Sequence, residues 1–237
     1  MDRRWSSLAI LGAMAACLWT STAAVRADEV ILLTSDAGGG ANCVRILSGG
    51  VNTNYVTNDI VSVYHRGGNL QNSLLLFDLS SIPAGKTITK ATLTLWNDSA
   101  IWGTGDQGND TQVFRAAKPW VQWQVTWNRS SGYRSSNAVL WDIPGGDIIG
   151  ITGQIDGSDP YGAASTGGLA SDDLANGPSP GRIVELDINV TSLVTEWYNG
   201  VSPNYGMIVT AQDPNGLHFR ADRGDDPTLY PTLTVDF

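Results

Sequence analysis

The chain has 237 residues and a formal net charge of −9 at neutral pH, with 23 Asp and Glu against 14 Lys and Arg. A surface this acidic repels phosphate groups, so we expect no nucleic acid and no anionic lipid as partners. The two histidines are too few and too isolated to indicate a zinc site or a histidine-based catalytic triad.

Residues 1–27 have the pattern of a secretory signal peptide. Arg3 and Arg4 precede an apolar run over residues 8–19, and the small residues that follow end in a cleavage site after Ala27. We therefore expect a protein that is secreted, either to the periplasm or to the extracellular space.

A membrane anchor and a lipid anchor are the alternatives for this segment. The apolar run is shorter than the roughly 20 residues that span a bilayer, which favours cleavage, and no second apolar stretch of that length follows. A lipid anchor on Cys17 is the weaker alternative, because lipoprotein signals usually place Leu three residues before the Cys. After cleavage only Cys43 remains, so we expect no internal disulfide and a buried thiol.

Short segments of alternating apolar and polar residues recur along residues 28–237. They are rich in β-branched and aromatic residues and are bounded by Gly, Pro, Asn or Asp, which predicts β-strands. Many short strands with almost no helix between them indicate a single all-β domain, either a sandwich or a barrel. The clearest of these segments are 30–33, 60–64, 73–77, 91–96, 112–115, 183–187, 206–210 and 232–236.

One segment follows a helical period instead. Over residues 190–198 the apolar side chains recur at i, i+3, i+4 and i+7, the last of them being Trp197. Asn189 or Thr191 can cap the start, and Gly200 can end it. We predict one short amphipathic helix with Trp197 as its inward anchor.

Residues 142–182 form a long irregular insert that is rich in Gly, Pro and Asp. A loop of this length is either functional or a mobile surface excursion, and for its middle we favour the second. Further along, residues 213–216 read as a hairpin turn.

Four motifs occur in order along the chain: Asn72–Leu95, Trp120 with Thr126–Asn128, Leu186–Trp197 with Asn204–Gly206, and Tyr230–Leu233. Together they resemble the DNRLRE domain, which is grouped with the family 96 carbohydrate-binding modules. The resemblance implies a jelly-roll-like antiparallel β-sandwich that accompanies glycan-active enzymes or lies on surface proteins, without activity of its own. Two features depart from the family pattern: Gln122 stands where members often have an acidic residue, and the string that names the family is absent.

Trp and Tyr rings are the candidate ligand-binding residues, because sugars present flat C–H faces that pack on them. We expect Trp96, Trp120 and Trp127, which occupy strand or motif positions, to be buried in the core. The aromatic residues in segments predicted as loops are the binding candidates: Trp102, Trp123, Tyr133 and Trp141.

An acidic, Gly-rich loop over residues 103–110 offers oxygen ligands for a structural calcium ion. Asp106, Asn109 and Asp110 are the candidate ligands, although the register of an EF-hand is not met and a solvated turn is the alternative. No other cofactor is indicated.

Catalysis is not indicated by any motif. No nucleophile elbow, zinc-protease helix or phosphate loop occurs, and Glu185 and Glu196 are both expected at solvated positions. We therefore predict a secreted, non-catalytic module that binds an extracellular or cell-wall polysaccharide. The alternative is a structural or adhesive cell-surface scaffold without sugar binding.

Overall fold

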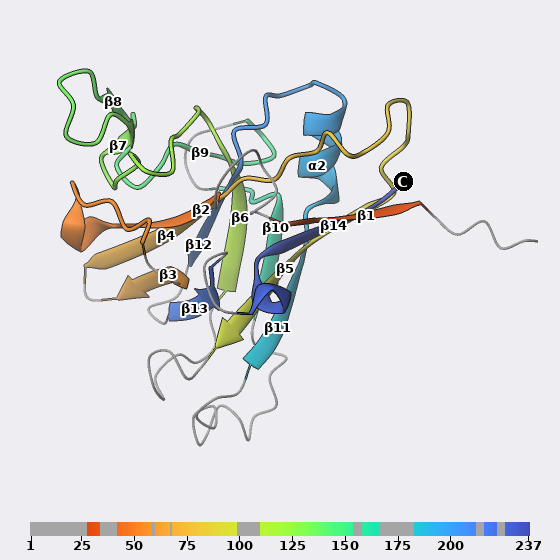
Figure 1. The fold of residues 1–237 in the computed structure, drawn as a ribbon, viewed down its shortest axis with the longest axis horizontal. Coiled ribbons are helices and arrows are strands. Elements are labelled where there is room, and N and C mark those ends of the chain that lie inside the picture. The colour runs from red at the N-terminus through yellow and green to blue at the C-terminus, as the bar shows by residue number, and fades with distance from the viewer. Residues whose placement is uncertain are drawn as a thin grey trace, which may run out of the picture.

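Antiparallel strands make up most of the computed structural model, which describes residues 28–33, 42–57, 60–66, 68–98, 110–153, 158–165, 183–211, 216–221 and 226–237 (Figure 1). The predicted signal peptide lies outside these residues. The strands are β1 (Glu29–Leu33), β2 (Cys43–Leu47), β3 (Ile60–Arg66), β4 (Asn69–Leu75), β5 (Lys90–Asp98), β6 (Asp110–Ala116), β7 (Arg129–Ser131), β8 (Val139–Leu140), β9 (Ile148–Ile149), β10 (Gly162–Ser165), β11 (Ile183–Asn189), β12 (Met207–Ala211), β13 (Gly216–Arg220) and β14 (Thr232–Asp236). One α-helix, α2 (Thr191–Tyr198), and two 3-10 turns, η2 (Ser48–Gly50) and η4 (Pro227–Leu229), accompany them.

The strands form two facing sheets, which makes the fold an all-β sandwich. The first, here called the β5 sheet, has the order β1-β14-β5-β11. The second, here called the β4 sheet, has the order β2-β4-β12-β6 and continues into β9 and β10. β3 and β13 connect them, because β3 pairs with both β4 and β13, and β13 reaches β5 through the pair Phe219↔Asn97.

The prediction of a hairpin turn at residues 213–216 is wrong. β12 pairs with β4 and β6, whereas β13 pairs with β3 and β5, so the two strands on either side of this segment are not partners in the described sheet. The connection is therefore a crossover between the two layers. Residues 212–215 themselves lie outside the described residues.

The main core lies between the two sheets. Alternate residues of the β5 sheet point into it, including Leu93 and Leu95 of β5 and Ile188 of β11. Met207 and Val209 of β12 meet them from the β4 sheet, each with at most 1% of its surface exposed. Cys43 is buried among them and forms no disulfide, as the sequence predicts.

The β4 sheet is buried on its other face as well. Residues 117–147, here called the loop layer, cover that face and include β7 and β8 (Figure 1). Trp127 and Trp141 of the loop layer form a second apolar cluster with Leu74 of β4, Ile46 of β2 and Ile208 of β12. Consecutive residues of one strand therefore belong to different cores: Leu74 to the second and Leu75 to the first.

The predicted helix is confirmed as α2. Its first amide, that of Thr191, donates to Asn189 Oδ1 at 3.0 Å, and Trp197 is buried in the main core. Gly200 follows with φ of +68°, a left-handed conformation that glycine adopts without steric cost and that ends the helix. No helix in the described part of the chain is long and apolar enough to cross a membrane.

Candidate functional site

The loop layer displays Trp123, one of the predicted binding residues, on its outer surface. Among the described side chains it is the one aromatic residue with more than half of its surface exposed, at 58%. The ring lies in a tight turn in which the amides of Gln124 and Val125 both donate to the Val121 carbonyl at 2.8 Å. Tight turns with internal hydrogen bonds hold a side chain in a fixed direction.

Asn54 stabilises the Trp123 turn through two hydrogen bonds. Its Nδ2 donates to the carbonyl of Gln122 at 2.8 Å and to that of Val125 at 2.7 Å, so one amide joins both ends of the turn. Gln122 itself is buried, and its Nε2 donates to the Cys43 carbonyl of β2 at 3.1 Å. Gln122 therefore anchors the turn to the β4 sheet and does not face outward.

Tyr133 is the second predicted residue that the loop layer holds near its surface. Gln124 Oε1 accepts a hydrogen bond from the Gly132 amide at 2.8 Å, which ties the β7–β8 connection to the Trp123 turn. Tyr133 is half-buried, and the Arg134 guanidinium lies 5.0 Å from its ring centroid, a cation–π contact. Asn54 gives no local signal in the sequence, because its contacts join residues 68 and 71 positions apart, and Gln124 and Arg134 belong to no motif.

The backbone at this connection is unusual. Gly132 has φ of +76°, and a Cβ there would lie 2.6 Å from the Ala138 Cα, so only glycine fits. Arg134 adopts φ of +60°, a left-handed conformation that is uncommon for a residue with a long side chain. Strained residues of this kind persist where the surrounding structure over-determines them, and they cluster at binding sites.

The expectation that Trp141 is exposed is wrong. Only 4% of its surface is exposed, and its Nε1 donates to the Thr126 carbonyl at 3.1 Å. Trp127, by contrast, is buried as predicted, and Trp96 and Trp120 are half-buried. Trp141 packs with Trp127 in the second apolar cluster, so its ring supports the loop layer from inside.

The remaining candidates lie mostly outside the described residues. Trp102, Asp106 and Asn109 belong to the segment 99–109, and Asp110 is described only as the first backbone position of β6. Their binding roles stay predictions. Within the described residues, no three His, Cys, Asp or Glu side chains converge in a way that could hold a metal ion.

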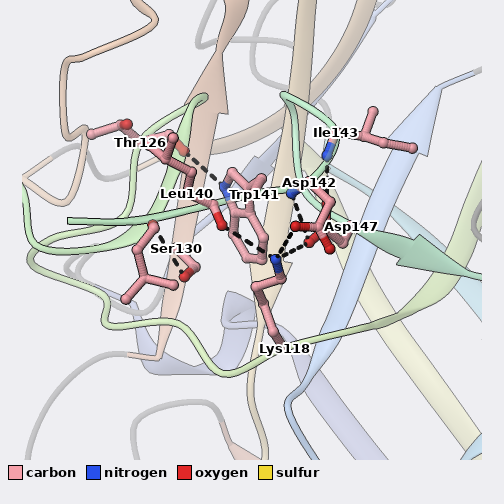
Figure 2. A network of polar contacts seen from close by, with 9 residues as sticks. Lys118, Thr126, Ser130, Leu140, Trp141, Asp142, Ile143 and Asp147 are labelled. Atoms are coloured by element: carbon pink, nitrogen blue, oxygen red, sulfur yellow. Dashed lines mark hydrogen bonds and ion pairs between the residues drawn. The ribbon is translucent and has the colours of Figure 1, made fainter.

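A charged network fastens the C-terminal end of the loop layer (Figure 2). Lys118 Nζ lies 2.7 Å from Asp147 Oδ2 and 2.9 Å from Asp142 Oδ1, and it donates to the Leu140 carbonyl at 3.2 Å. Asp147 has no exposed surface, and its two oxygens also accept the amides of Asp142 and Ile143 at 3.0 and 2.7 Å. The buried carboxylate is thus fully hydrogen-bonded, as a buried charge must be.

The two aspartates set the proton affinity of Lys118. Burial alone would lower the pKa of its ammonium group, but the hydrogen bonds and negative charges of Asp147 and Asp142 outweigh burial, so the pKa lies above its ordinary value. The two aspartates therefore favour the charged form of Lys118.

A second polar cluster lies beneath α2 and corrects one expectation. Glu196 was predicted to be solvated, but it is half-buried and accepts hydrogen bonds from the Tyr161 hydroxyl at 2.9 and 3.1 Å and from Ser202 Oγ at 3.3 Å. Burial raises the pKa of Tyr161; the hydrogen bond with Arg115 opposes this rise, and Glu196 adds to it. Glu185, on the outer face of β11, is exposed as predicted.

The fold places this chain among the all-β sandwich proteins, here with the loop layer packed on the outer face of one sheet. Residues 45–235 match the Disaggregatase related repeat domain, and the chain belongs to that family. This is a repeat family related to the DNRLRE domain and the family 96 modules. Membership of the DNRLRE family itself stays a prediction. The membership suggests a domain of repeat or surface type. No curated protein matches the chain.

Proposed function

We propose that this chain is an exported, non-catalytic domain that binds an extracellular or cell-wall polysaccharide through Trp123, with Tyr133 and Arg134 beside it. The observation that carries the proposal is the exposure of Trp123, because an indole ring with 58% of its surface in water lacks the burial that normally holds aromatic residues. Such rings pack on the C–H faces of sugars.

Pre-organisation supports the same proposal. Asn54 and Gln124 hold the two segments that carry Trp123 and Tyr133 in place. A site whose side chains are ordered before binding loses less conformational entropy when the ligand arrives, so weak contacts with hydroxyl groups suffice.

Affinity gel electrophoresis of residues 28–237 tests the proposal, with a panel of neutral and acidic polysaccharides in the gel. We expect at least one polysaccharide to retard the wild type, Trp123→Ala to abolish the retardation and Trp123→Phe to keep part of it. Val201→Ala is the matched control, because Val201 is 73% exposed and lies outside the loop layer.

Two further measurements separate the proposal from its rivals. Retardation by no polysaccharide of a folded protein would favour the scaffold role, and release of reducing sugar from any retarding polysaccharide would show an enzyme. Mass spectrometry of the protein recovered outside the cytoplasm tests export. We expect the recovered chain to begin at Asp28.

A further inference from the structure

Both outer surfaces of the sandwich carry exposed apolar side chains, and the two surfaces lie on opposite sides. The loop layer covers the β4 sheet from outside, and the main core separates the β4 sheet from the β5 sheet. The outer face of the β5 sheet is therefore the surface opposite to the loop layer. In Figure 1, β7 and β8 lie at the upper left, β1 and β14 lie right of centre, and β5 and β11 lie near the lower centre.

The loop layer is apolar and slightly basic. Half of the exposed large hydrophobic side chains in the described part of the chain belong to it, and both residues of β8 are among them: Val121, Trp123, Val139, Leu140 and Ile143. Three basic residues, Lys118, Arg129 and Arg134, stand against Asp142 and Asp147, a net charge of +1 in a chain of −9.

The outer face of the β5 sheet is mostly polar and acidic, with one exposed isoleucine on each of its two edge strands, β1 and β11. Residues of β5, β11 and β14 that alternate with the core positions point to this face, where Ile31 and Ile183 are 58% and 41% exposed and Trp96 is half-buried. Among the strand positions whose side chains are described, the charged residues on this face are four acids and one base: Glu29, Glu185, Asp187, Asp236 and Lys90.

We infer that copies of this chain associate head to tail, with the loop layer of one copy on the outer face of the β5 sheet of the next. Each surface offers apolar side chains that gain from burial, and their net charges are opposite, whereas contact between two like surfaces would bring like charges together.

Because the two surfaces differ and lie on opposite sides, the association does not close into a pair. A heterologous contact of this kind makes a ring or an open filament, whereas a contact between identical surfaces stops at a dimer. The inference therefore predicts assemblies that grow with concentration, and it is independent of sugar binding.

Sedimentation velocity of residues 28–237 tests the inference over about 1 µM to 1 mM, the range in which weak protein contacts form. We expect the weight-average sedimentation coefficient of the wild type to rise throughout without levelling at a dimer. Leu140→Asp should hold the protein monomeric across the range, and Val201→Asp, at the most exposed apolar position outside both surfaces, should behave as the wild type.

A charge exchange distinguishes head-to-tail contact from any other. Arg134→Glu and Glu185→Arg should each weaken self-association at least tenfold. An equal mixture of the two should again form assemblies that grow with concentration, because both contacts between the unlike variants then pair opposite charges. A monomeric wild type at all concentrations, a limiting dimer, or association that Glu185→Arg leaves unchanged would each overturn the inference.

Discussion

Lys118 Nζ lies 2.7 Å from Oδ2 of Asp147, a carboxylate with no exposed surface, and the same ammonium group also contacts Asp142, whose side chain is 75% exposed. The pair joins the second residue of the loop layer to its last. The two carboxylates on this lysine differ in burial and in the backbone amides that they accept, so their removal should have different costs.

Asp147→Ala should lower the free energy of unfolding by about 3–5 kcal/mol, because it breaks a buried ion pair and leaves two amides without an acceptor. Asp142→Ala should cost below about 1 kcal/mol, the usual range for an exposed pair. Urea denaturation followed by tryptophan fluorescence measures both. Equal costs would contradict the assignment of Asp147 as the residue that fastens the loop layer.

Substitutions of the buried and of the exposed tryptophan of the loop layer should differ in their effect on stability. Trp141→Ala removes a ring that is 4% exposed and should destabilise the protein by about 3–5 kcal/mol. Trp123→Ala should change stability by no more than about 0.5 kcal/mol, since the ring packs little. Thermal denaturation of the two variants checks this, and a large loss of stability in Trp123→Ala would mean that the ring is structural.

His218 should remain neutral far below the usual pH. Burial, with a smaller contribution from the charge of Arg45, lowers the pKa of its imidazole to about 4. Between pH 6.5 and 4 the unfolded chain binds this proton and the folded chain does not, so the free energy of unfolding falls as the pH falls through that window. The decrease is on the order of 3 kcal/mol for this one group.

An NMR titration of the imidazole signals measures this directly, with His218→Asn to assign the resonance. The same variant should lose stability more gradually than the wild type between pH 6.5 and 4. A His218 signal that titrates near pH 6.5 would contradict the prediction.

The contact between Tyr161 and Glu196 should support the end of the sandwich that α2 covers. Tyr161→Phe removes a hydrogen bond to a carboxylate and should cost about 2 kcal/mol, whereas Tyr133→Phe, at the surface of the loop layer, should cost almost nothing. Chemical denaturation of the two variants is the measurement.

The raised pKa of Tyr161 adds a dependence on alkaline pH. Because the folded chain holds this proton more tightly than the unfolded chain, the stability gained is present below pH 10 and is lost as the pH rises through the folded pKa. Absorbance titration should show one tyrosine that ionises above the others, and Tyr161→Phe should remove that step.

The sequence predicts the β5 sheet well because one face of that sheet meets the core and the other meets water. Strand β5 alternates Leu93 and Leu95 inward with Thr92 and Thr94 outward, and such alternation is a local signal. Strand β2 gives no such signal, because Cys43 enters the main core while Val44 enters the second. A strand buried on both faces lacks the period of two.

The candidate site is predicted only in part for the same physical reason. Exposure of Trp123 follows from its position between polar neighbours, but the burial of Trp141 depends on packing against Trp127. The Asn54 contacts join residues 68 and 71 positions apart, and the Asn72 contact with Gly145 joins residues 73 apart. Such contacts have no local pattern, so the loop layer could not be predicted as a folded unit.

The buried thiol of Cys43 can report how often the sandwich opens locally. Its thiol is 3% exposed, and its carbonyl accepts the Gln122 amide that anchors the Trp123 turn. A thiol reagent can reach the sulfur only while β2 separates from its neighbours, so the rate of labelling reports how often the centre of the sandwich opens. Gln122 donates to the carbonyl of the same residue, so a sugar that stabilises the Trp123 turn should also lower the rate at which Cys43 is labelled. Binding could then be followed without a probe attached to the surface.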